Sequence, residues 1–506
     1  MKKLLIWMMF LLPVTAWAQS AAVKQIMKMA KEDNRTMQHL DVLCNRFGGR
    51  LSGSYACESA EKWAKKCFEE WGYDVKLEKI GDMGVGFSRG GWWGRATGEE
   101  NMVLHFATPS FTSGTKGPQS GHIVLEPLSH TEFERNKARL KGAWVLIECP
   151  TESGFALPRG DSKRFVDKRD AILKQNDEIA EKQGKRPDRS EMNKGLPALL
   201  YDEMVEAGVL GFIRSTPVPL NALHDTLVIR RNHTFDMIPS VPDILLDEEQ
   251  FARLHTAASE RRKVTLEFDI RNYFRPGPIP YHNVVASIKG SKYPDEYVIL
   301  SAHLDAYDIS SGGVDCGNGV AAVMEAARML SVAKAKPERT IIFILFGGEE
   351  FGLRGSKAWI EAHKDKLDKV SIVFNRDGGP LPYVGFDVPK SLVKEYEAVA
   401  EPIRQVYPEY DFKIGVAEPM ERPEKPRTAD HYTFRYWGIP AATMTMKDIK
   451  GYGFSYREIR HTERDSYQSV YPDYEEQSAP ILAIIALGSA NLSKMVPREE
   501  FYEPKK

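Results

Sequence analysis

The prediction of the fold starts from the stretch YVILSAHLD (residues 297–305). Its first six residues are a mostly apolar run with the length of a buried strand, and His303 and Asp305 follow directly. Segments of helical and strand character then alternate, with helices predicted at 320–333 and 353–363 and strands at 340–346, 370–374 and 439–446. Strands that alternate with helices form a mostly parallel sheet covered on both faces. The predicted fold is therefore α/β, a mostly parallel mixed sheet flanked by helices.

Acidic residues and a histidine gather at the carboxyl ends of the predicted strands. Besides His303 and Asp305 they are Asp315 in the turn 313–319, the pair Glu349 and Glu350 after the second strand, and Asp377 after the third. In open α/β sheets, binding sites form in the crevice beyond these strand ends. Several carboxylates at one edge repel each other unless a cation compensates them. The pattern predicts a metal site.

A change in the predicted secondary structure along the chain indicates two structural units. Residues 19–106 indicate helix, loop, helix and strand, whereas residues 107–275 contain short β-type runs separated by polar loops. The stretch RPGPIP (residues 275–280) is predicted as a linker back to the alternating region. We therefore expect one domain made of 19–106 and 276–506, interrupted by a β-rich accessory domain at 107–275.

The N-terminus is typical of an export signal. Lys2 and Lys3 precede an apolar run at 4–12, and Ala16-Trp17-Ala18 forms an A-x-A cleavage pattern. The apolar run is too short to cross a bilayer comfortably. We expect cleavage after Ala18 and a mature protein without a membrane anchor, located in the periplasm or secreted.

Composition and missing motifs exclude several classes of function. Among 506 residues, 69 are Lys or Arg and 70 are Asp or Glu, so no bulk positive charge is available for nucleic acid or an anionic membrane. The five cysteines show no zinc-finger spacing, so His and carboxylates must hold any metal. The sequence has no H-E-x-x-H helix of a zinc protease.

The ordered motifs resemble those of the zinc aminopeptidase family, which also includes glutamate carboxypeptidases and glutaminyl cyclases. They are HxD at 303–305, an Asp before a Gly-rich helix start, a Glu-Glu pair, a further Asp, and a late histidine, His461, in HTERDS (461–466). NRDGG (375–379) and the insert are similar to the carboxypeptidase Q-like branch, and the insert resembles a protease-associated domain. The resemblance spans the mature chain and is most specific over 283–377 and 428–466.

This resemblance implies a role for each site residue. His303 and Asp377 would hold one zinc ion, Glu350 and His461 a second, and Asp315 would bridge the two; cobalt or manganese could replace zinc. Glu349 would take a proton from the attacking water, and Asp305 would orient His303. Three further residues are expected near the substrate or the oxyanion: Tyr452 or Tyr456, and His431, which is more typical of a structural or substrate-facing residue than of a ligand.

Three functions remain open at this stage. The first is an exopeptidase that releases an N-terminal residue or cleaves dipeptides, with a short peptide as substrate. The second is a glutaminyl cyclase on the same scaffold, and the third is a non-catalytic peptide-binding ectodomain. A homodimer is compatible with the resemblance. Cys316 stands where relatives usually carry Asp or Asn, and its thiol would lie close to the metals.

Overall fold

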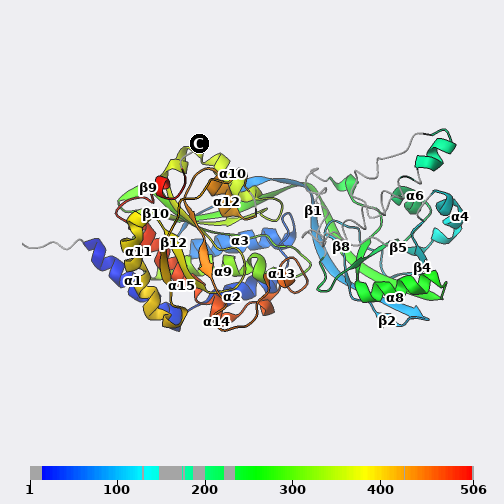
Figure 1. The fold of residues 1–506 in the computed structure, drawn as a ribbon, viewed down its shortest axis with the longest axis horizontal. Coiled ribbons are helices and arrows are strands. Elements are labelled where there is room, and N and C mark those ends of the chain that lie inside the picture. Colours follow the sequence, from blue (N-terminus) through cyan, green and yellow to red (C-terminus); the bar gives the residue numbers. More distant parts are fainter. Residues whose placement is uncertain are drawn as a thin grey trace, which may run out of the picture.

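The computed structural model describes residues 14–127, 130–147, 174, 177–185, 200–221, 234–426 and 428–503. Most of the expected signal peptide, 1–18, lies outside these residues. The described part folds into two lobes joined by a long two-stranded ribbon (Figure 1). No helix in the described ranges has both the length and the apolar character needed to cross a membrane.

The larger lobe is built on a sheet with the order β14-β11-β9-β10-β8. The strands are β8 (Val264–Ile288), β9 (Tyr293–His303), β10 (Arg339–Phe346), β11 (Val370–Asn375) and β14 (Ala441–Ala442). Pairing is parallel from β14 to β10 and antiparallel between β10 and β8. The predicted α/β fold with a mostly parallel sheet is confirmed.

Helices cover both faces of this sheet, as its alternating side chains require. On β9, Val298 and Leu300 belong to a core with α9 and α15, whereas Ile299 belongs to a core with α10 and α12. The helices of this lobe are α1 (Val14–Glu32), α2 (Thr36–Asp41), α3 (Tyr55–Glu70), α9 (Asn318–Val332), α10 (Arg354–Ala362), α11 (Val393–Val406), α12 (Asp430–Tyr436), α13 (Tyr456–Ile459), α14 (Pro472–Glu475) and α15 (Ser478–Ala490).

The predicted strand at 439–446 is in fact two strands in different sheets. Residues 441–442 form β14 at the edge of the main sheet, and β15 (Met444–Met446) pairs with β12 (Tyr383–Val388). β12 also pairs with β13 (Lys413–Val416), which completes a three-stranded sheet. The chain leaves one sheet for the other at residue 443, a change that a continuous apolar run does not signal.

The ribbon consists of β1 (Asp74–Gly98) and β8, which pair antiparallel from Asp74 opposite Ser287 to Gly98 opposite Val264. The linker predicted at 275–280 is therefore wrong, because these residues lie inside β8. A two-stranded ribbon leaves one edge of each strand unpaired, so a proline without an N–H is tolerated there. Three irregularities in register, between residues 79 and 92, interrupt the pairing where the ribbon passes between the lobes.

The smaller lobe extends the ribbon with the strands β4, β5, β6, β7 and β3 in that order. Its elements are β2 (Met102–Val103), β3 (Phe106–Ala107), β4 (Gln119–Leu125), α4 (His130–Leu140), β5 (Ala143–Ile147), α6 (Tyr201–Glu206), β6 (Gly211–Thr216), β7 (Asp243–Asp247) and α8 (Glu248–Ser259). Two apolar clusters of its own, one around Trp144 and Phe268 and one around Phe212, fill its interior. The boundaries 107–275 stay a prediction.

Candidate metal centre

The structure brings five predicted metal-binding residues together at the carboxyl ends of the strands. They are His303, the last residue of β9, Asp315 in the turn before α9, Glu350 after β10, Asp377 after β11, and His461 after α13. All five side chains are at least nine-tenths buried. They converge because parallel neighbours end at the same edge of the sheet.

Asp315 lies between the two imidazoles. Its Oδ1 is 3.1 Å from Nε2 of His303, and its Oδ2 is 3.0 Å from Nε2 of His461. Nε2 of His461 is also 3.0 Å from Oε2 of Glu350, and Nε2 of His303 is 3.9 Å from Oδ1 of Asp377. The five side chains thus divide into two sets that share one carboxylate.

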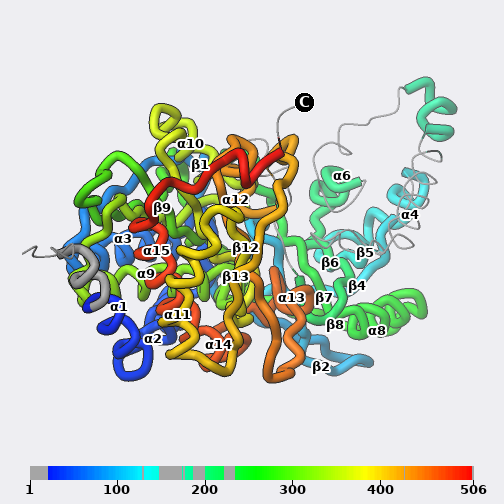
Figure 2. Tube along the Cα trace, turned by 60° about the vertical axis from the view of Figure 1, so that its left-hand side comes forward, coloured from blue at the N-terminus to red at the C-terminus, as the bar shows by residue number. Residues whose placement is uncertain are grey.

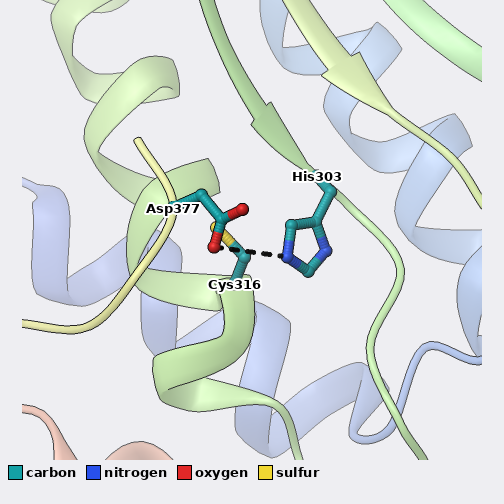
Figure 3. A group of neighbouring side chains, drawn as sticks. All are labelled: His303, Cys316 and Asp377. Atoms are coloured by element: carbon teal, nitrogen blue, oxygen red, sulfur yellow. Dashed lines mark ion pairs between the residues drawn. The ribbon is translucent and has the colours of Figure 1, made fainter. Parts of the chain in front are cut away.

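These donors fit bound metal ions. Ligand atoms of His303, Asp315 and Glu350 lie within 4.8 Å of one another, as do those of His303, Cys316 and Asp377 (Figure 3). Oε1 of Glu350 is buried and accepts no hydrogen bond from the described residues. Imidazole and carboxylate are donors that zinc accepts.

The electrostatics of the centre are those of a compact cluster of opposite charges. Burial alone would raise the pKa of Asp315, but hydrogen bonds from His303 and His461 hold it well below its usual value. Burial would lower the pKa of His461, yet Glu350 and Asp315 raise it to about 9. Burial raises the pKa of Asp377 to about 6. These shifts reflect the close pairing of the two imidazoles with the carboxylates around them.

Asp305 holds the Glu349–Glu350 turn. Its Oδ1 accepts from the main-chain N–H of Glu349 at 3.1 Å, and its Oδ2 accepts from that of Glu350 at 3.3 Å and from the hydroxyl of Ser52 at 3.2 Å. The nearer contact of Nδ1 of His303 is the main-chain oxygen of Asp305, at 2.9 Å, whereas the Asp305 carboxylate is 3.9 Å away. The residue thus contacts the imidazole through its backbone and the glutamate pair through its side chain.

Asp465 holds the turn that carries Asp315. Its Oδ1 accepts from the main-chain N–H of Val314 at 2.6 Å, and its carboxylate also accepts from the N–H of Asp315 at 3.3 Å. The loop that carries His461 and Asp465 is strained. His461 has a φ of +61°, a left-handed conformation unusual for a residue with a side chain. Such a residue costs about 1–3 kcal/mol and persists only where its surroundings hold it.

Glu349 is buried beside the cluster and takes no place in either ligand set. Burial, together with the charges of Glu350 and Asp377, raises its pKa well above the usual value, although His303 acts in the opposite direction. A buried carboxylate that readily holds a proton is suited to general acid–base work.

The three residues expected near the substrate lie in different surroundings. Tyr456 is close enough to Asp315 and Asp377 that their charges, after burial, raise the pKa of its hydroxyl. Tyr452 is 44% exposed and donates its hydroxyl to Asp473 at 2.7 Å, so it is not part of the cluster. His431 follows Asp430 in α12, and burial beside Arg435 lowers its pKa to about 3.

One residue at the centre, Arg460, went unrecognised in the sequence. It donates from Nε to Oδ2 of Asp315 at 2.8 Å. Its only local signal is adjacency to His461, and a charged residue beside a histidine is too common a pattern to indicate a site. Asp430, next to His431 in α12, is fully buried, and burial raises its pKa to about 7.

The comparisons with known proteins point to one family. Residues 283–484 match the model of peptidase family M28. Carboxypeptidase Q from Rattus norvegicus is 26% identical over 498 residues, covering 94% of this chain and 90% of that protein, and the Mus musculus protein is 25% identical with the same coverage.

Solved structures share the fold. A peptidase M28 precursor from Shewanella amazonensis SB2B superposes with a TM-score of 0.58 at 20% identity, covering 97% of this chain and all of the other. BSAP, a zinc aminopeptidase from Bacillus subtilis, gives a TM-score of 0.51 at 15% identity, covering 93% of this chain and 98% of the other. The match of residues 283–484 to peptidase family M28 and the similarity of the chain to carboxypeptidase Q support a zinc metallo-exopeptidase, and the solved structures show that the fold is shared.

Proposed function

We propose that the chain is a two-metal exopeptidase that hydrolyses the peptide bond after a free N-terminal residue of short peptides, including dipeptides. The observation that carries this proposal is the position of Asp315, with one oxygen facing His303 and the other facing His461. His303 and Asp377 would hold one zinc ion, and Glu350 and His461 the other. Cobalt or manganese can take the place of zinc in such a donor set.

The proposed hydrolysis requires the chain to move one proton from the attacking water to the leaving amine. Metal ions bound at these residues would make a water more acidic and polarise the scissile carbonyl. Glu349 accepts the proton of the attacking water on its carboxylate and passes it to the leaving amine. Asp305 keeps the Glu349 carboxylate in register, because it accepts from the N–H groups of both glutamates. Tyr456 is the nearer of the two tyrosines for donation to the oxyanion.

Cellular location belongs to the same proposal. The N-terminal pattern of Lys2, Lys3 and Ala16-Trp17-Ala18 supports export to the periplasm or the medium. A small peptide is then the partner that the family suggests. Mass spectrometry of the mature protein tests the cleavage, with Gln19 expected as the first residue.

Hydrolysis of free dipeptides beside their N-acetylated counterparts tests the reaction, with zinc supplied and the Glu349→Gln protein as a control. We expect cleavage of the free dipeptides only, and none by the control. Metal analysis of the same samples should give two ions per chain. Absence of cleavage by the unmutated protein would contradict the exopeptidase and favour the cyclase or peptide-binding alternatives.

A further inference from the structure

The smaller lobe contacts the loop that carries His461. Glu463, two residues further along, donates its main-chain N–H to the oxygen of Leu220 at 2.9 Å. In return, the N–H of Leu220 donates to Oε1 of Glu463 at 3.0 Å, and Oε2 lies 2.8 Å from Nε2 of His105. Both carboxylate oxygens and the main chain of Glu463 are therefore engaged by the smaller lobe. Figures 1 and 2 both show α13, which leads into this loop, on the side of the larger lobe that faces the smaller lobe.

The groups that receive Glu463 are themselves fixed. Nδ1 of His105 is 3.2 Å from Oδ2 of Asp247, and Oδ1 of Asp247 caps α8 by accepting from the N–H groups of residues 249 and 250. The main chain of His105 donates to Oε1 of Gln250 and accepts from the N–H of Asp247. His105 is thus held by residues of α8 and β7, and it holds Glu463 in turn.

A second contact joins the smaller lobe to the loop that follows His303 and Asp305. Leu220 packs in an apolar cluster with Ala107, Leu245 and Ile309. Nearby, Asp308 accepts from Arg89 on the ribbon at 3.0 Å and from Ser110 at 2.6 Å. Both loops of the metal centre that face the smaller lobe are therefore bonded to it.

The strained backbone at His461 needs contacts such as these to hold it. A left-handed φ at a histidine persists only if neighbouring bonds hold it. On one side, hydrogen bonds within residues 459–465 hold the turn, and on the other Glu463 and Leu220 hold it. Loss of the second set leaves His461 free to relax from the position in which Nε2 faces Asp315 and Glu350.

We propose that Glu463 is a positioning residue through which the smaller lobe holds His461 in its metal-binding geometry, so that docking of this lobe sets the affinity of the second metal ion. This inference rests on the role of His461 in the proposed function. Groups that orient a metal ligand typically change metal affinity by about 10–100-fold when they are removed. Coupling is reciprocal, so the second ion must in turn strengthen the contact with Leu220.

The test compares metal binding by the full-length, metal-depleted proteins. Cobalt is titrated into the unmutated chain and into Glu463→Gln, His105→Gln and Glu458→Gln, and the absorbance of bound cobalt gives the affinity of each ion. Glu458 is exposed, lies three residues before His461 and has no side-chain bond within the described residues, so its variant removes the same charge without touching the contact. A His461→Gln protein identifies which ion belongs to the second set.

We expect Glu463→Gln and His105→Gln to weaken that ion at least tenfold, to leave the other unchanged, and Glu458→Gln to match the unmutated chain. Hydrogen exchange at the amides of residues 220 and 463 should slow when the second ion binds to the unmutated chain or to Glu458→Gln, but not in Glu463→Gln or His105→Gln. Equal affinities in all four proteins would overturn the inference. If the unmutated chain binds two ions with this pattern but cleaves no peptide, the proposed reaction fails and the inference stands.

Discussion

At the scale of single residues, Glu349 is the side chain on which the proposed reaction depends most directly. It is buried beside the ligands but outside both ligand sets, and its raised pKa favours proton transfer. Replacement by Gln keeps the size and removes the exchangeable proton site. We expect kcat to fall by about 10²–10⁴-fold. Cobalt titration checks that both ions still bind with unchanged affinity, and a loss of metal together with activity would contradict a purely acid–base role.

Cys316 allows a second prediction at this scale. Its Sγ donates to the main-chain oxygen of Arg376 at 3.0 Å, and burial raises the pKa of the thiol to about 11. The reactive thiolate is then roughly one part in a thousand at pH 8. Although the sulfur lies beside His303 and Asp377, we expect hydrogen peroxide to inactivate the unmutated and Cys316→Ser proteins at the same rate. Slower inactivation of the variant would show that this thiol is the sensitive group.

At the scale of elements, α9 joins the metal centre to the N-terminal helices through a buried charge network. Glu325 on α9 is fully buried and accepts from the main chain of Arg35 at 3.0 Å. It also lies 3.1 Å from Nε2 of His39 and pairs with Arg328 at 2.7 Å. This carboxylate therefore fixes the start of α2 against a helix whose first turn follows Asp315.

The network predicts how stability depends on pH. Burial opposes ionisation of Glu325, but Arg328 and His39 lower its pKa below the usual 4.5. A lowered carboxyl pKa stabilises the fold above pH 4.5, and this contribution is lost as pH falls through the lower, folded-state value. Glu325→Gln should cost roughly 3 kcal/mol at pH 7, because it removes the buried one of the two carboxylates that pair with Arg328.

Urea unfolding followed by circular dichroism from pH 7 down to pH 3 measures this effect. The unmutated protein should lose stability more steeply below pH 4.5 than Glu325→Gln does. Glu32→Gln, at an exposed Lys28–Glu32 pair, is the matched control and should change stability by less than about 1 kcal/mol. Parallel pH profiles for the unmutated chain and Glu325→Gln would contradict the assignment.

The elements differ in how far the sequence predicts them. Strands such as β9 and helices such as α9 are continuous apolar runs bounded by glycine and polar residues, so a local pattern suffices. The ribbon is rich in glycine because neighbouring atoms come close: a Cβ on Gly90 would lie 2.1 Å from the oxygen of Arg271, and one on Gly86 would lie 2.7 Å from that of Gly53. These glycines weaken the strand pattern, and the pairing partner lies almost 200 residues away.

The same distinction applies to the metal centre. His303, Glu350 and Asp377 follow predictable strands and Asp315 precedes a predictable helix, so the topology alone brings them to one edge. The contacts of Arg460 with Asp315 and of Glu463 with His105 join residues that are 145 and 358 positions apart. No local pattern carries information about such contacts, and they required the folded chain.

At the scale of the whole molecule, each lobe has an apolar interior of its own, and a small cluster with Leu220 and Ile309 joins the two. Among the described residues, the clusters around Trp144 and Phe212 contain none from the helices that cover the main sheet. Chains with two such cores commonly unfold in more than one step. Zinc at about 1,000 times its dissociation constant adds about 4 kcal/mol to the stability of the unit that binds it.

Calorimetry of the metal-depleted and zinc-loaded protein tests this arrangement. We expect two transitions, of which zinc raises that of the larger lobe more than that of the smaller lobe. Calcium at the same concentration serves as a control, because it prefers six to eight oxygen ligands. A single transition that shifts as a whole would indicate that the two lobes unfold as one cooperative unit.

The ribbon has a consequence for how such a chain can be rebuilt. Gly98 and Val264, where the paired part of the ribbon ends within the smaller lobe, are direct cross-strand partners. The segment between them therefore leaves the ribbon and returns to it at neighbouring positions. A two-residue turn such as Asn-Gly could replace this segment and connect the two strands as a hairpin. The smaller lobe could therefore be replaced by another domain whose two ends lie at the same spacing. Such a replacement would leave the strand order of the main sheet unchanged.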